Sequence, residues 1–242
     1  MLRSLARPAA ASSSTFAARR PWALAARRLF IQTESTPNPE ALKFLPGKDV
    51  LESGSRDFRS LKDAQASPLA RRLFATEGVT SVFLAADFVT VSKSDEMDWV
   101  ALKPQIFGAM MDFYASGEPV LSEESGSEEL DSLVITDDDS EVVQMIKELL
   151  EMRIRPSVQE DGGDIVYRGF DDESGVVTLQ MQGSCAGCPS SSVTLKAGIE
   201  NMLRHYIPEV KEVRDIAADD EEMGFEVNMM DLVKTKPPKP RD

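Results

Sequence analysis

The sequence of residues 175–206 is GVVTLQMQGSCAGCPSSSVTLKAGIENMLRHY, and this stretch decides the architecture of the second half of the chain. Its first part alternates apolar and polar side chains, which predicts a strand with one buried face. Its last part has apolar residues at helical spacing, namely Leu195, Ile199, Met202, Leu203 and Tyr206. Between them lies Gly183-Ser184-Cys185-Ala186-Gly187-Cys188-Pro189, whose proline suits the first turn of a helix. The cysteine pair therefore lies between a strand and a helix N-terminus.

The flanking sequence completes a small domain at residues 140–218. An amphipathic helix is predicted from Ser140 onward, and Pro156 is expected to stop it. Asp161-Gly162-Gly163-Asp164 predicts a tight turn with positive φ at its glycines. Gly163–Asp171 is predicted to pair with residues 175–182 as a hairpin, and Val210–Ile216 is predicted as a last short strand.

Residues 31–117 predict a second small domain. Short strands are expected at Phe30–Glu34 and Ala41–Leu45, separated by the turn Thr36-Pro37-Asn38-Pro39. Ser67-Pro68 opens a helix, Val79–Lys93 predicts a hairpin, and a longer helix follows from Trp99, with Pro104 near its first turn or kinking it. This β-β-α-β-β-α order favours an antiparallel sheet with helices on one side. The fold class is thus α+β, with two small domains that each pack helices on an antiparallel or mixed sheet.

The remaining segments are distinguished by their charge. Residues 1–30 carry six arginines and no acid, which is typical of a mitochondrial presequence. Residues 118–139 hold eight acids after Ser122 and no basic residue there, which indicates a solvated linker. Residues 219–242 are acidic, then rich in Lys and Pro, and are expected to be a disordered tail.

Charge and hydropathy also exclude two classes of partner. From residue 34 onward, 21 basic and 41 acidic side chains give a formal net charge of −20. Because phosphates would be repelled, nucleic-acid binding is not expected. No apolar run approaches the ~20 residues that a membrane-spanning helix needs, so no membrane partner is expected.

Cys185 and Cys188 are the candidate metal and cofactor ligands. Two thiolates at this spacing can face one metal centre, and the small residues around them leave room for an inorganic core. The partial positive charge of a helix N-terminus favours thiolate over thiol. An iron–sulfur cluster usually takes four thiolates, so two chains with two cysteines each would supply the set at a homodimer interface.

Other chemistries fit a lone Cys-x-x-Cys pair. A zinc dimer with four cysteines is one; His205, the only histidine, is a weaker candidate ligand and is expected on a helix surface. A thiol–disulfide oxidoreductase is another, although no Trp adjoins the pair and the flanking β-β-α order differs from the βαβ context of such enzymes. A metal role for Asp161 or Asp164 is a minor hypothesis.

Three motifs together resemble the C-terminal domain of NifU-like (Nfu) iron–sulfur scaffold proteins: Val158-Gln159-Glu160-Asp161-Gly162-Gly163-Asp164, the cysteine segment through Ser190, and Thr194-Leu195-Lys196-Ala197-Gly198-Ile199-Glu200. Gln32-Thr33-Glu34-Ser35-Thr36-Pro37-Asn38-Pro39, with Leu42-Lys43-Phe44 and Gly47, resembles the N-terminal domain of the mitochondrial members.

The resemblance implies a carrier in the mitochondrial matrix, not an enzyme. Such a carrier holds a [4Fe–4S] cluster between two chains, receives it from upstream assembly proteins, and delivers it to apo-proteins such as lipoate synthase or respiratory-complex subunits. We expect the N-terminal domain to serve partner recognition or to control access to the dimer.

Overall fold

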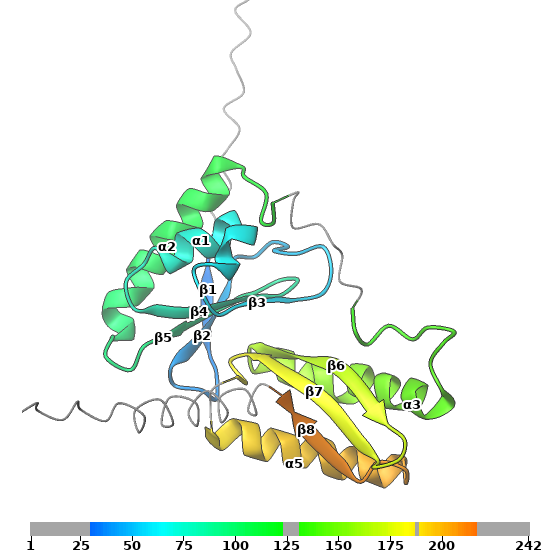
Figure 1. The fold of residues 1–242 in the computed structure, drawn as a ribbon. Helices are drawn as coiled ribbons and strands as arrows, with labels where there is room; N and C mark the ends of the chain where they lie inside the picture. The colour runs from blue at the N-terminus through cyan, green and yellow to red at the C-terminus, as the bar shows by residue number, and fades with distance from the viewer. Residues whose placement is uncertain (1–29, 123–130, 187–188, 217–242) are drawn as a thin grey trace, which may run out of the picture.

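The computed structural model describes residues 30–122, 131–186 and 189–216, so the predicted presequence and tail lie almost wholly outside the described residues. The N-terminal domain is built on a five-stranded antiparallel sheet in the order β1-β2-β5-β4-β3 (Figure 1). Its strands are β1 (Gln32–Ser35), β2 (Ala41–Leu45), β3 (Arg56–Phe58), β4 (Val79–Leu84) and β5 (Val89–Lys93). The short strand β3 and the 3₁₀ turn η1 (Asp63–Ala66) were not predicted.

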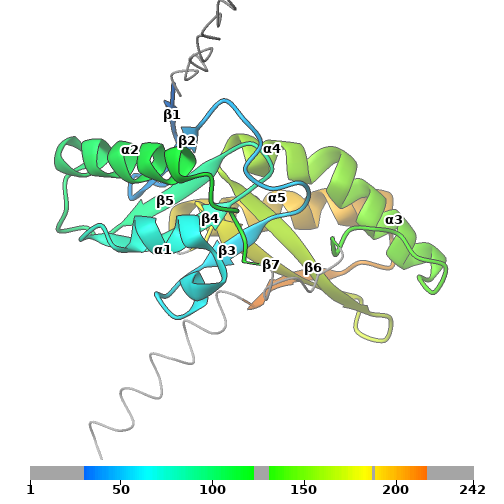
Figure 2. The ribbon, with the colours of Figure 1, turned by 90° about the horizontal axis from the view of Figure 1, so that it is seen from above.

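Two helices, α1 (Pro68–Phe74) and α2 (Trp99–Ser116), cover one face of this sheet (Figure 2). Ser67 begins α1 as predicted, because its hydroxyl accepts a hydrogen bond from Ala70 N–H. Apolar residues of both helices pack on the inward side chains of the sheet in one buried core, including Leu69, Leu73, Leu102, Ile106, Phe44, Val82 and Val91. The prediction of an antiparallel sheet with helices on one side is therefore confirmed.

The C-terminal domain begins with a helix in three parts: α3 (Glu141–Leu149), the π-helical turn η3 (Leu150–Ile154) and α4 (Arg155–Glu160). The prediction that Pro156 stops this helix is wrong. Pro156 occupies the first turn of α4, where its missing N–H is tolerated, and the π-helical turn precedes it. Buried Ile146, Leu150, Ile154 and Val158 then face one core.

The second sheet has three strands in the order β6-β7-β8: β6 (Gly163–Asp171), β7 (Val176–Gly183) and β8 (Glu212–Asp215). The predicted hairpin of β6 and β7 is confirmed, and the last strand is present. β8 pairs with β7 in parallel, connected through α5 (Pro189–Tyr206). Because β7, α5 and β8 form a βαβ unit, the sequence-based argument that this context is missing is wrong. The unit therefore gives no reason to reject a redox dithiol.

Both described ends of the acidic segment contact a domain, which differs from the expected solvated spacer. Val120 and Leu121 pack on the N-terminal core, while Leu133 is buried in the C-terminal core. Asp139 forms an ion pair of 2.7 Å with Lys147 of α3. The acids here pair with specific cations and begin the C-terminal domain.

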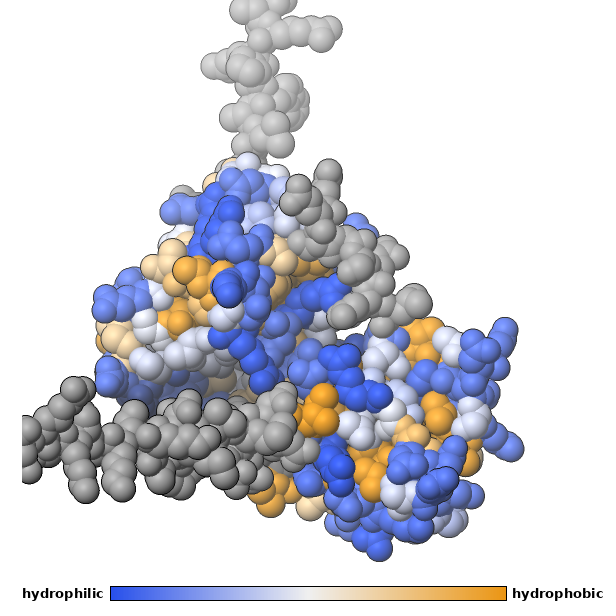
Figure 3. Space-filling view, in the orientation of Figure 1, coloured by the Kyte–Doolittle hydropathy of each residue, from blue (hydrophilic) through white to orange (hydrophobic). Residues whose placement is uncertain are grey.

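The face shown in Figure 3 is mostly hydrophilic, with small separate apolar areas on each domain. No helix within residues 30–122, 131–186 and 189–216 is both long and apolar enough to cross a membrane.

Candidate functional site

Cys185 lies two residues after Gly183, the last residue of β7. Gly183 ends the strand with φ of +66°, a conformation that favours glycine, and Ala186 N–H donates to Gly183 O at 3.2 Å. This tight turn buries Cys185 in the domain core with 4% of its surface exposed. Helix α5 begins at Pro189 as predicted, whereas Cys188 lies outside the described residues. We call residues 183–186 the cysteine loop.

The glycine turn, residues 161–164, packs against the cysteine loop. Gly162 has φ of +83°, as predicted for a turn glycine, but Gly163 does not adopt positive φ. Gly163 is needed for space: a Cβ there would lie 2.7 Å from Cys185 Sγ and 2.6 Å from Gln182 O. Ser184 connects the two segments, since its hydroxyl donates to Asp161 O at 2.5 Å and lies 3.9 Å from Cys185 Sγ.

A cavity of about 570 Å³ lies beside Cys185, within the usual size range of small-ligand sites. Its walls come from η3, α4, α5 and both loops, together with one residue of the N-terminal domain. The lining residues are Pro37, Arg153, Ile154, Ser157, Asp161, Ser184, Cys185, Thr194, Leu195, Gly198, Ile199 and Met202. Burial, followed by the nearby charge of Glu160, raises the pKa of Asp161, and Lys43 acts against both. A soft sulfur ligand thus lines a space that is apolar over much of its wall.

Cys185 is a soft sulfur donor, which suits a soft metal centre better than a hard cation. Asp164, one of the two minor metal candidates, instead binds Arg155. Its two carboxylate oxygens accept hydrogen bonds from Arg155 Nε and from a terminal nitrogen of the same guanidinium, each at 3.1 Å. Arg155 also pairs with Asp131 and Glu151, and sequence reasoning gave it no role. His205 is exposed on α5 as predicted, with its ring edge-on to Tyr206.

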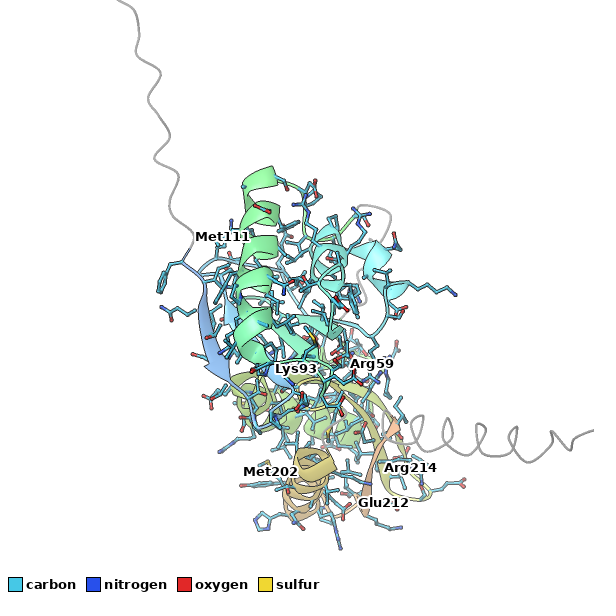
Figure 4. The ribbon with its side chains drawn as sticks, turned by 90° about the vertical axis from the view of Figure 1, so that its left-hand side faces the viewer. Arg59, Lys93, Met111, Met202, Glu212 and Arg214 are labelled. Carbon is cyan, nitrogen blue, oxygen red and sulfur yellow. The ribbon has the colours of Figure 1, made fainter. Side chains whose placement is uncertain are left out.

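The N-terminal domain contacts the main chain around the cysteine loop, which sequence reasoning did not predict. The face of its sheet away from α1 and α2 meets the C-terminal domain, and Arg59 lies where the two domains join (Figure 4). Four side chains donate to carbonyl oxygens: Thr90 to Gly162 (2.7 Å), Lys43 to Gln159 (3.1 Å) and Glu160 (3.4 Å), Arg59 to Met181 (3.3 Å), and Asn38 to Ser184 (3.3 Å). A fifth, Asp57, accepts from Gly183 N–H. We call this set the interdomain contact.

Two glycines permit this close approach. A Cβ on Gly162 would lie 3.0 Å from Thr90 Oγ1, and a Cβ on Gly183 would lie 3.0 Å from a ring carbon of Phe83. Burial raises the pKa of Asp57, while Arg59 and the Gly183 N–H oppose that shift. Burying the Asp57 carboxylate costs free energy, and the hydrogen bonds from Arg59 and from the Gly183 N–H offset part of that cost. Asp57 is thereby held against the cysteine loop.

Comparison with known proteins gives two family matches. The model of the Nfu/NifU scaffold protein N-terminal domain matches residues 31–117, and the NifU-like domain matches residues 146–214. The chain is 58% identical to NifU-like protein 4, mitochondrial, of Arabidopsis thaliana, over 81% of this chain and 69% of that protein. It is 56% identical to the human NFU1 iron-sulfur cluster scaffold homolog, mitochondrial, over 84% of this chain and 77% of the relative. A solution structure of a Saccharomyces cerevisiae NifU-like protein is 27% identical, with a TM-score of 0.37, and the match covers 51% of this chain and 99% of that one.

Proposed function

This chain belongs to the NifU-like (Nfu) family of iron–sulfur cluster scaffold proteins, and we propose that it holds one [4Fe–4S] cluster between two copies of itself. Cys185 and Cys188 of each copy supply the four thiolates. The observation that carries the proposal is the placement of Cys185 Sγ beside a cavity, against Gly163, where any larger residue would collide with the sulfur.

The chain's own residues give the site three properties that suit a carrier. The small residues of both loops leave space at the sulfur, and the N-terminus of α5 favours the thiolate form. The cavity wall beside Cys185 includes the side chains of Ile154, Leu195 and Met202, which limit the access of water. When bound, the cluster is cargo, and a site shared by two chains can open as the chains separate.

The names of its relatives support a mitochondrial location, and within the mitochondrion we propose the matrix as the compartment of this carrier. It receives the cluster from upstream assembly proteins and passes it to apo-proteins such as lipoate synthase and respiratory-complex subunits, acting as a carrier and not as an enzyme.

Anaerobic reconstitution of cysteine variants tests the ligand assignment. Cys185→Ser and Cys188→Ser should each lose the cluster, measured as iron and sulfide per chain, while far-UV circular dichroism stays unchanged. Thr80→Ser, at an exposed position of β4, is the matched control, because it leaves the cysteine loop and both thiols unchanged; it should bind the cluster as the unmodified chain does. Full iron content in either cysteine variant would overturn the assignment.

A thiol–disulfide oxidoreductase is the second candidate, favoured by the βαβ unit that α5 forms with β7 and β8. The two functions differ in a simple assay. Catalytic reduction of insulin by the chain, with no iron retained after reconstitution, would favour the dithiol. A colourless dimer that binds zinc would indicate a structural metal instead.

A further inference from the structure

The interdomain contact is directed at main-chain atoms just before Cys185 and at those of the glycine turn that packs against it. Its carbonyl acceptors and its N–H donor lie in two short stretches. Residues 159–162 are the end of α4 and the first half of the glycine turn, and residues 181–184 are the end of β7 and the start of the cysteine loop. Gln182 adds a side chain to the contact, because its Oε1 accepts from Ser55 Oγ at 3.4 Å. The N-terminal sheet therefore bonds mainly to main-chain atoms, and this holds the two loops in their observed backbone conformation.

This arrangement restrains the residues next to the sulfur. Ser184, the neighbour of Cys185, is held from two sides, by Asn38 through its carbonyl and by Asp161 through its hydroxyl. Gly183 is held by Asp57. While these bonds persist the cysteine loop cannot swing outward, and Cys185 stays 4% exposed.

A second copy must approach the same place. A cluster shared by two chains brings both cysteine loops within the span of one cluster, so each loop has to present its thiolates at the surface. We call the chain docked when its two domains are joined by the interdomain contact. In the docked chain, Pro37 forms part of the wall of the cavity beside Cys185, and the adjacent Asn38 donates a hydrogen bond to Ser184 O. The N-terminal domain thus forms part of the wall of the cavity through which a partner loop would reach the sulfur.

We propose that the N-terminal domain shields the cysteine loop: the docked chain keeps Cys185 closed, and sharing a cluster with a second copy requires the interdomain contact to open. This inference rests on the proposed cluster sharing and adds a control step to it. The domains remain tethered when they part, because only residues 123–130 separate the Ser122 bond to Ala66 from the Asp131 pair with Arg155. Redocking within one chain therefore competes with the pairing of two chains.

Two substitutions in the full chain weaken the contact without touching the cysteines. Thr90→Val removes the donor to Gly162 O and keeps the side-chain shape. Asn38→Asp keeps the oxygen that accepts from Glu40 N–H and places a carboxylate against Ser184 O. Thr80→Val, at an exposed position of β4, is the matched control. Each lost hydrogen bond should shift the docking equilibrium about fivefold toward the open form.

Three readouts are compared: hydrogen exchange of the Gly183 amide, alkylation of Cys185 followed by peptide mass, and the rate of anaerobic cluster loading. We expect each to rise about fivefold in Thr90→Val and Asn38→Asp, in proportion to the open fraction, and to stay unchanged in Thr80→Val. Unchanged Gly183 exchange would overturn the assignment of these bonds as the restraint. Faster exchange with unchanged or slower alkylation would overturn the shielding. Faster alkylation in chains that never take up a cluster, the unmodified one included, would reject the cluster proposal and leave the shielding intact.

Discussion

Replacing Gly163 with alanine tests how closely the glycine turn is fitted to Cys185. The new Cβ would meet Cys185 Sγ at 2.7 Å and the carbonyl oxygen of Gln182 at 2.6 Å. Ordinary contacts between nonbonded heavy atoms lie near 3.5–4.0 Å, so the sulfur would have to move by about 1 Å. The carbonyl cannot withdraw easily, because Gly163 pairs with Gly183 in the β6–β7 ladder.

The expected loss of stability follows from two opposing effects. Forcing a methyl group into a packed site destabilises a domain by about 1–3 kcal/mol. Alanine also lowers the backbone entropy of the unfolded chain, which stabilises the folded domain by about 0.4–1 kcal/mol. This gain applies here because Gly163 does not adopt a positive φ. We therefore expect a net loss of about 1–2 kcal/mol from the C-terminal domain, together with a reduced capacity for iron.

Urea denaturation followed by circular dichroism measures the first effect, and iron content after reconstitution measures the second. Gly108→Ala is the control, since its Cβ meets nothing within 4 Å in the middle of α2 and should stabilise the chain by about 0.5–1 kcal/mol. A Gly163→Ala chain with an unchanged urea midpoint and full iron content would refute the claim that the turn is shaped around the sulfur.

Three further predictions concern the framework of the two domains. Asp164→Asn should destabilise the C-terminal domain by about 3 kcal/mol, because it leaves the buried face of Arg155 without its bidentate partner; a loss under about 1 kcal/mol in urea would contradict this. Ser67→Ala should cost about 1–2 kcal/mol by removing both the cap of α1 and the hydrogen bond to Val120 O, and an unchanged thermal midpoint would speak against it. Burial raises the pKa of Tyr114 and of Tyr167 to about 12, so the stability from their neutral forms is complete below about pH 10 and is lost as the pH rises toward 12; phenolate absorbance appearing for both near pH 10 would contradict this.

The sequence predicted the elements whose signals are local. The alternation in β7 and the Ser67-Pro68 start of α1 specified those elements, because periodicity and caps act within a few residues. The three-residue strand β3 was not predicted, because Arg56-Asp57-Phe58 contains one apolar residue and is too short to show the alternation of a strand. The direction of β8 also carried no local signal, because parallel pairing depends on how α5 crosses the sheet.

The π-helical turn has a physical reason that the sequence shows only in retrospect. Buried residues recur every four positions at Ile146, Leu150, Ile154 and Val158. In an α-helix of 3.6 residues per turn this spacing drifts by about 40° at each step. The wider π turn reduces the drift, keeps the four residues toward one core, and lets Pro156 begin a new α-helical segment.

The cysteine site was predicted as a loop between strand and helix, but its surroundings were not. Lys43 and Thr90 look like solvent-facing residues of their strands, since polar positions there alternate with buried apolar ones. Their partners are main-chain oxygens 116 and 72 residues away, so no local pattern encodes the contact. Arg155 was overlooked because a helical arginine is usually solvated, whereas this one is buried against Asp164.

The measurement that tests the central claim most directly is the native mass of the anaerobically reconstituted chain, with iron and sulfide determined on the same sample. We predict a species of two chains that carries about four iron and four sulfide ions. Cys185 and Cys188 should be protected from alkylation in it, and the two chains should separate when the cluster is removed. A cluster held by a single chain, or a dimer that retains its mass with zinc or with no metal, would contradict it.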